Sequence, residues 1–437
     1  MNRFARACCS AAALSLLVPA IAGAQDRPEP RRNPFADLFG RATDKTAKEY
    51  TRLDFKTTTG VQKGQTLTAD SGEDSGIQDG ISAGADATLL LEHIRDRVRI
   101  QVHGRGSYQE YRQAHPFGAP AYDAGARLMF QPTTRLTFNG QAGVVRSPFF
   151  HTLELSPFDM SRPALPADAF AMRLINNSLY EASAGVTSNY TRRSSVSAVV
   201  NMRQMHFDES RQNDFSTRGA EARWQRKVTR DLAVHAGFGH EQIQQRRDDA
   251  QPFVSERIDV GIDFARSVAI ARRTAMSFAT DTSVTRENDG PKHYRVNGAI
   301  ELDKRFQRSW QATVGARRST DFLPGFGQPV LSDRGSASIG GYLATRLSLQ
   351  ANADAGRGQI GFDDQRKFNV YSADARLTVA VTPHIGMFTQ YVYYNYQLPP
   401  DAQSALLLPR LSRQAFSIGI QTWVPIINKD KVSSDSR

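Results

Sequence analysis

Residues 369–396 read NVYSADARLTVAVTPHIGMFTQYVYYNY, and this stretch decides the fold. From Tyr371 to Val381 apolar side chains occupy every second position, and polar ones such as Asp374 fall between them. Residues 382–384 then reverse the chain, and a second alternating run leaves from Ile385. A period of two is that of a β-strand with one apolar and one polar face. The stretch therefore predicts a hairpin with long strands and a short turn.

The first 24 residues have the features of a signal peptide. Arg3 and Arg6 precede an apolar run, and the run ends in the small-residue motif 22–24 (AGA). We therefore expect an exported protein that begins at Gln25, followed by a proline-rich, charged periplasmic extension over residues 25–47. The only cysteines, at positions 8 and 9, lie within the signal, so the mature chain would have no thiols for disulfides or metal sites.

The plan of the hairpin recurs along most of the chain. Short polar turns, each between two alternating runs, are expected at residues 93–97, 132–135, 191–194, 227–231, 266–272, 304–308, 344–346 and 382–384. Eight turns join sixteen strands, and an opening strand near 50–59 with a closing one near 413–424 makes eighteen, with sixteen as the fallback. An even count with both ends on one side predicts an antiparallel up-and-down transmembrane β-barrel over residues 48–425, with a polar tail over 426–437.

The connections at the other end of the barrel are longer, over residues 60–76, 112–120, 147–178, 208–215, 248–254, 287–292, 322–333, 358–367 and 398–411. Short turns at one end and long loops at the other are typical of outer-membrane barrels, whose long loops face outward. Closure has a strong physical reason, because an unpaired backbone group in hydrocarbon costs several kcal/mol.

The polar face of the strands should line the interior. The lumen-lining residues expected there are Arg99, Arg105, Arg127, Arg203, Arg223, Arg257, Arg295, Arg317, Arg376, Asp86, Asp259, Asp263 and Asp374. Both signs of charge are present, so a structural lattice of ion pairs and a solvated, solute-lining surface are both open. His103 and His235 fall on the same face, and spacing gives neither an acidic partner.

The excess of 55 basic over 44 acidic residues gathers in the short turns. A periplasmic basic collar is expected from Arg95, Arg97, Arg135, Arg192, Arg193, Arg230, Arg273, Arg305, Arg308 and Arg346. Arginine suits fork-like contacts to phosphate or carboxylate. The collar could contact lipid headgroups, gather an anionic polymer or dock an acidic periplasmic protein.

The longest connection, 147–178, is apolar for an external loop. Its aromatic residues Phe149, Phe150, Phe158 and Phe170 suggest a loop that folds into the barrel as a constriction, or one that packs on neighbouring loops. We find no G-x-S-x-G or H-E-x-x-H motif, so we expect no enzyme, no metal and no cofactor.

By its signal, its alternating strands and its aromatic strand ends, the chain resembles bacterial outer-membrane β-barrel proteins. Its final strand, residues 415–424 (AFSIGIQTWV), resembles the C-terminal signal read by the barrel-assembly machinery, although a polar tail follows it. An eighteen-strand wall with a basic inner mouth resembles the barrels that act beside periplasmic polysaccharide-export proteins.

The resemblance implies an outer-membrane protein in contact with lipid, and a channel for export of a polysaccharide. The alternatives are a general diffusion porin for small solutes, anionic ones included, and a structural barrel without transport. No nucleic-acid partner is expected.

Overall fold

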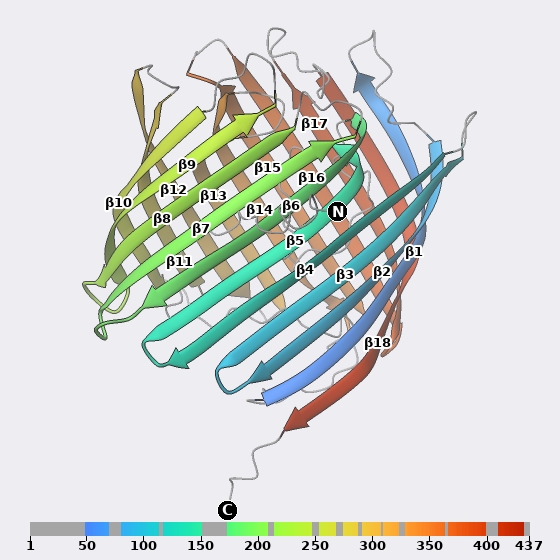
Figure 1. The fold of residues 1–437 in the computed structure, drawn as a ribbon. Coiled ribbons are helices and arrows are strands. Elements are labelled where there is room, and N and C mark those ends of the chain that lie inside the picture. Colours follow the sequence, from blue (N-terminus) through green and yellow to red (C-terminus); the bar gives the residue numbers. More distant parts are fainter. Residues whose placement is uncertain are drawn as a thin grey trace, which may run out of the picture.

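The computed structural model describes residues 49–69, 80–112, 117–150, 173–208, 214–246, 253–267, 274–286, 291–306, 309–322, 328–362, 366–398 and 410–431. These residues form eighteen antiparallel strands, each hydrogen-bonded to the next along the chain. The first strand, Glu49–Ala69, also pairs with the last, Arg410–Lys431, so the sheet closes on itself (Figure 1). The predicted all-β, eighteen-strand barrel is confirmed, and the sixteen-strand fallback is not needed.

The strands are β1 (Glu49–Ala69), β2 (Gly80–Arg95), β3 (Val98–Arg112), β4 (Phe117–Thr133), β5 (Leu136–Phe150), β6 (Arg173–Ser188), β7 (Ser194–Phe207), β8 (Phe215–Lys227), β9 (Leu232–Gln245), β10 (Phe253–Ser267), β11 (Thr274–Arg286), β12 (Lys292–Phe306), β13 (Trp310–Phe322), β14 (Pro329–Ala344), β15 (Leu347–Ile360), β16 (Lys367–Thr382), β17 (Ile385–Gln397) and β18 (Arg410–Lys431). The strands tilt strongly against the barrel axis, as closure of a sheet requires (Figure 1). No helix among the described residues is long and apolar enough to cross a membrane.

Short turns gather at one end of the barrel. The hairpins β2–β3 and β16–β17 each reverse through two residues, 96–97 and 383–384. In the first, Asp96 has a φ of 41°, a left-handed conformation that Asp and Asn tolerate better than most residues. Glu49 and Lys431 are register partners at this same end, so the first and last strands begin and end together.

Several predicted connections are shorter than expected, because the strands run into them; residues 117–120, 329–333 and 358–360, for example, belong to β4, β14 and β15. Residues 60–69 were assigned to a loop but complete β1, which pairs with β2 and β18 on its two sides. Residues 147–150 and 173–178 belong to β5 and β6, and residues 410–411 belong to β18. At the other end β18 continues to Lys431, past residue 425 where the prediction ended the barrel. Polar residues hid these extensions, since Lys63 and Gln65 look like loop residues, but Lys63 pairs with both β2 and β18 and Gln65 pairs with β18.

The two faces of the sheet differ in chemistry. Large apolar side chains such as Val200, Val260 and Ile418 are about half exposed, and they share one face of the register. Polar and charged side chains on the other face, such as Gln390 and His235, are buried. Side chains diverge on the outside of a barrel and converge on the inside, so the polar face is the lumen face. An exterior of this kind suits lipid.

Candidate functional site

The candidate site is the lumen face of the wall. Register partners in an antiparallel sheet share a face, so the set can be followed strand by strand. All thirteen residues assigned to the lumen lie on this one face, which carries Arg99, Arg105, Arg127, Arg203, Arg223, Arg257, Arg295, Arg317, Arg376, Asp86, Asp259, Asp263 and Asp374.

Many of these charges form ion pairs between strands. Arg105 of β3 binds Asp86 of β2 through its Nε. Arg203 of β7 lies 3.4 Å from Glu181, and Arg257 of β10 lies 3.8 Å from Glu221. Such pairs brace the wall, as the lattice interpretation requires, and they also hold charged groups at the lumen surface.

The densest group of charges sits where β8, β9 and β10 meet. The Arg223 guanidinium lies 3.3 Å from Asp259 and 2.8 Å from Asp263. The His235 ring bridges the same two carboxylates, with Nε2 2.9 Å from Asp259 and Nδ1 3.0 Å from Asp263. Gln225 also donates to Asp263 at 2.9 Å. We call Arg223, His235, Asp259 and Asp263 the histidine cluster.

Sequence spacing missed these histidine partners. His235 of β9 lies opposite Gly261 of β10, so Asp259 and Asp263, two residues to either side of Gly261, reach the ring from positions that no local motif links. His103 likewise lies 3.1 Å from Asp123 on the neighbouring strand β4. Only the pairing of strands reveals these contacts, because strand neighbours lie far apart in the chain.

The remaining lumen residues make fewer charge contacts. Arg376 donates to Gln421 at 2.8 Å and lies 3.9 Å above the Phe388 ring, a cation–π geometry. Asp374 accepts a hydrogen bond from Asn352 at 2.9 Å. Other contacts join Arg99 to Glu92, Arg127 to Gln141 and Arg295 to Asp333, while Arg317 is exposed.

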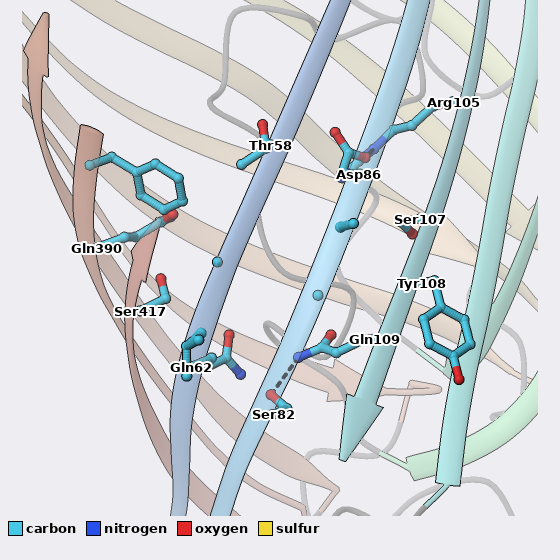
Figure 2. A pocket seen from close by; sticks show the side chains of 15 residues that line it. Thr58, Gln62, Ser82, Asp86, Arg105, Ser107, Tyr108, Gln109, Gln390 and Ser417 are labelled. Atoms are coloured by element: carbon cyan, nitrogen blue, oxygen red, sulfur yellow. Dashed lines mark hydrogen bonds and ion pairs between the residues drawn. The ribbon is translucent and has the colours of Figure 1, made fainter. Parts of the chain in front are cut away.

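A cavity of about 80 Å³ opens in the lumen face where β17, β18, β1, β2 and β3 lie side by side (Figure 2). Its floor is a row of three glycines, because Gly84 pairs with Gly60 and Gly60 pairs with Gly419. Glycine in a strand often marks a close approach of a ligand or of another group. The Phe388 ring covers the Gly419 end, where an added Cβ would lie 2.8 Å from the ring. Gln109 bounds the Gly84 end.

Two polar rows flank the glycine floor. Thr58 and Asp86 are register partners on one side, and Asp86 is held there by Arg105. Ser82, Gln62, Ser417 and Gln390 form the row on the other side. Gln109 donates to Ser82 at 2.8 Å across the cavity edge (Figure 2). The Tyr108 side chain points away, and the polar side chains share the lining with the Phe388 ring and apolar atoms of the strands.

The Gln390 side chain is 1% exposed, and neither its amide nitrogen nor its oxygen has a hydrogen-bond partner. Thr58 Oγ1 and Asp86 Oδ1 are also buried without a partner. Buried polar atoms are nearly always hydrogen-bonded, so a group of orphans around one cavity calls for an explanation. The prediction placed Gly60 and Gln62 in an external loop, and the cavity was therefore missed.

The collar residues within the described ranges all lie exposed at the short-turn end: Arg95, Arg97, Arg135, Arg192, Arg193, Arg230, Arg305 and Arg346. Arg97 donates to the carbonyl oxygen of Pro132, which links two adjacent turns. Arg273 and Arg308 lie outside the described residues.

Of the predicted constriction residues, Phe149 is buried in an apolar cluster at the long-connection end of the lumen face, with its ring centroid 6.1 Å from that of Tyr111. Phe150 lies at the end of β5, and its side chain is outside the description. Phe158 and Phe170 also lie outside the described residues. Within the described ranges, no group of three or more His, Cys, Asp or Glu side chains is arranged to hold a metal ion.

Comparison with solved structures returns outer-membrane barrels. The chain is similar to OpdL of Pseudomonas aeruginosa (11% identity, 86% of this chain and 99% of that chain covered, TM-score 0.43). It is also similar to OccAB2 of Acinetobacter baumannii (10% identity, 86% and 98% covered, TM-score 0.43) and to the siderophore receptor PirA of P. aeruginosa (8% identity, 88% and 81% covered, TM-score 0.42). No protein-family model matches the chain, and no curated protein matches it. At these values the likeness carries no functional information.

The architecture of the barrel wall indicates the location of the protein in the cell. A closed antiparallel barrel leaves no sheet edge in hydrocarbon, and this one presents apolar side chains outward around its circumference. Barrels of this kind with an even strand number are the spanning proteins of the bacterial outer membrane. The chain is an outer-membrane β-barrel in contact with membrane lipid.

Proposed function

We propose that the chain is an outer-membrane channel through which small polar solutes diffuse. The observation behind this proposal is the closed wall of eighteen strands whose concave face is polar and charged. Barrels of 16–18 strands are wide enough to leave an aqueous channel, whereas barrels of about eight are filled by their own side chains.

The charges on the lumen face also favour a solvated pathway over a dry core. The Arg99 side chain is 44% exposed and that of Arg105 is 31% exposed, although both are ion-paired. Charged side chains of both signs, held in place by their partners, would offer a water-filled surface along which many small polar solutes can pass. Neither sign dominates this surface, so we propose weak selectivity.

Cysteine accessibility tests the pathway, because Cys8 and Cys9 are the only cysteines of the sequence and precede the barrel. Purified protein in planar lipid bilayers should give stepwise conductance. A bulky charged thiol reagent should reduce that conductance in Arg127→Cys, whose position is exposed on the lumen face. The matched variant Val200→Cys, exposed on the outer face, should not respond. Absence of conductance, or equal responses of both variants, would contradict a lumen pathway.

Export of a polysaccharide is the second candidate, and the exposed collar is the observation that favours it. A ring of arginines at the periplasmic mouth would attract an anionic polymer or an acidic partner such as a periplasmic polysaccharide-export protein. The collar would serve equally in contacts with lipid phosphates. We place it second because no feature of the lumen is specific to a polymer. Deletion of the gene should lower surface polysaccharide if this function holds, and unchanged amounts would remove it.

A further inference from the structure

The cavity floored by glycines offers hydrogen-bonding groups that nothing in the described structure satisfies. Gln390 contributes two N–H donors and a carbonyl acceptor, all without partners. Thr58 Oγ1 can donate and accept, and Asp86 Oδ1 accepts. Leaving such atoms unpaired away from water is unfavourable, so a polar occupant would be stabilised in the site.

The mixture of donors and acceptors specifies the chemistry of that occupant. Every hydroxyl group both donates and accepts, so several hydroxyls on one small molecule could satisfy the amide, the threonine and the carboxylate together. Asp86 and Arg105 are the two charged residues of the lining and compensate each other, while Lys56 lies within electrostatic reach of Asp86 outside the lining. A free anion would meet the acceptor atoms Asp86 Oδ1 and Gln390 Oε1, and this disfavours a carboxylate or phosphate.

The shape of the site also favours a polyhydroxylated occupant. Residues in neighbouring rows of a strand face lie about 7 Å apart, so removal of side chains at Gly60 and Gly84 leaves a slot between the two polar rows. The Phe388 ring closes one end of the slot as its only large apolar side chain. An apolar ring beside convergent hydrogen-bonding groups suits a molecule whose carbon skeleton carries hydroxyls around its rim.

We propose that this cavity, lined by Thr58, Asp86, Phe388 and Gln390 over the glycine floor, binds a neutral polyhydroxylated group the size of one sugar ring. The proposal rests on the channel function, because the cavity opens to the lumen, and it names the solute class that the channel would retain in passing. Ordered water is the competing occupant, since about 80 Å³ holds several water molecules.

Binding to the full barrel in detergent tests the site without depending on conductance. Three probes with the same six-membered ring separate the chemistries: D-glucose is neutral, D-glucuronate is an anion and D-glucosamine is a cation. Isothermal titration should show binding of D-glucose that exceeds binding of the two charged probes. If the barrel conducts nothing but binds D-glucose, the channel proposal fails and the site stands.

Two variants probe the cavity from different sides. Gln390→Leu removes the orphan amide, and D-glucose affinity should fall about tenfold or more. Gly84→Val places a side chain on the floor, where a Cβ would lie 3.3 Å from the Tyr108 carbonyl oxygen and 3.6 Å from Gln109, and should abolish binding. The control Gln350→Leu makes the same change on the same lumen row, outside the cavity, and should leave affinity unchanged.

Each of the following outcomes would contradict the proposed binding site. No D-glucose binding, or binding that survives both cavity variants, would assign the cavity to water. Tighter binding of D-glucuronate would reject the neutral ligand. An equal loss in Gln350→Leu would mean adsorption along the whole lumen. Folding of each variant is checked by the shift in gel mobility on heating, and Gly84→Val tests the site even if Gln390→Leu does not fold.

Discussion

The histidine cluster and the glycine-floored cavity are two buried polar regions of the same lumen face, and they differ in how their hydrogen-bonding groups are satisfied. In the cluster, one arginine and one histidine contact two carboxylates within 3.3 Å. In the cavity, the Gln390 amide has no partner at all. The charges of the cluster hold one another in ion pairs and make a region of wall, whereas an unpaired amide beside empty space makes a region that can accept something else.

Removal of Asp263 should have the largest effect, because it breaks the ion pairs of the cluster. In Asp263→Ala the buried His235 and Arg223 lose a shared carboxylate, and loss of one partner from a buried charge group costs about 3–5 kcal/mol. Urea unfolding in detergent measures the change. Asp333→Ala is the matched control, since Asp333 is 51% exposed where it pairs with Arg318, and an exposed pair contributes about 0–1 kcal/mol. Equal costs would mean that the cluster is not held by its charges.

Gly419→Ala should have an intermediate effect at the cavity. Its Cβ would overlap the Thr59 carbonyl oxygen and lie 2.8 Å from the Phe388 ring, so the wall must shift, at a cost of about 1–3 kcal/mol. Gly104→Ala tests the opposite case, because nothing lies within 4 Å of its added Cβ, and it should change stability by no more than about 0.5 kcal/mol. The same unfolding assay compares the two. If both alanines are neutral, the glycine floor is not required by close packing.

Gln390→Leu should have the smallest effect on stability, in contrast to its effect on binding. No protein hydrogen bond is lost, and removal of an unsatisfied amide is neutral or stabilising, within about 1 kcal/mol of the parent. Unfolding without added sugar gives the value. A loss above about 2 kcal/mol would show that the amide is satisfied in the folded protein, and the contrast between the two regions would disappear.

The fold was predictable from the sequence because its signal is local. The alternation around Tyr371 and Arg376 recurs in strand after strand, and the short turns mark where each hairpin reverses. The ends of β1, β5, β6 and β18 were misplaced where strands rise into polar surroundings, since Lys63 and Gln65 carry no apolar alternation. Pairing partners, rather than residue type, extend these strands.

The details of the site were less predictable because they depend on register. Alternation placed Asp259, Asp263 and His235 on one face, but only the β9–β10 register, which sets His235 opposite Gly261, shows that both carboxylates reach the same ring. Gly60, Gly84 and Gly419 are far apart in the chain, and their alignment requires the pairing of three strands. Three glycines at polar-face positions were the available signal, and it becomes visible once the first and last strands are set side by side.

The seam between β1 and β18 has a consequence for biogenesis. Gly60 and Gly419 face each other across this seam, so the floor of the cavity joins residues near the two extremes of the chain. A partly assembled sheet can form all the remaining strand pairs, but without the β1–β18 pair it lacks the glycine floor. Occupancy of the cavity would therefore indicate that the last strand pair, β1–β18, has formed. A ligand bound there would stabilise the closed barrel relative to every open precursor.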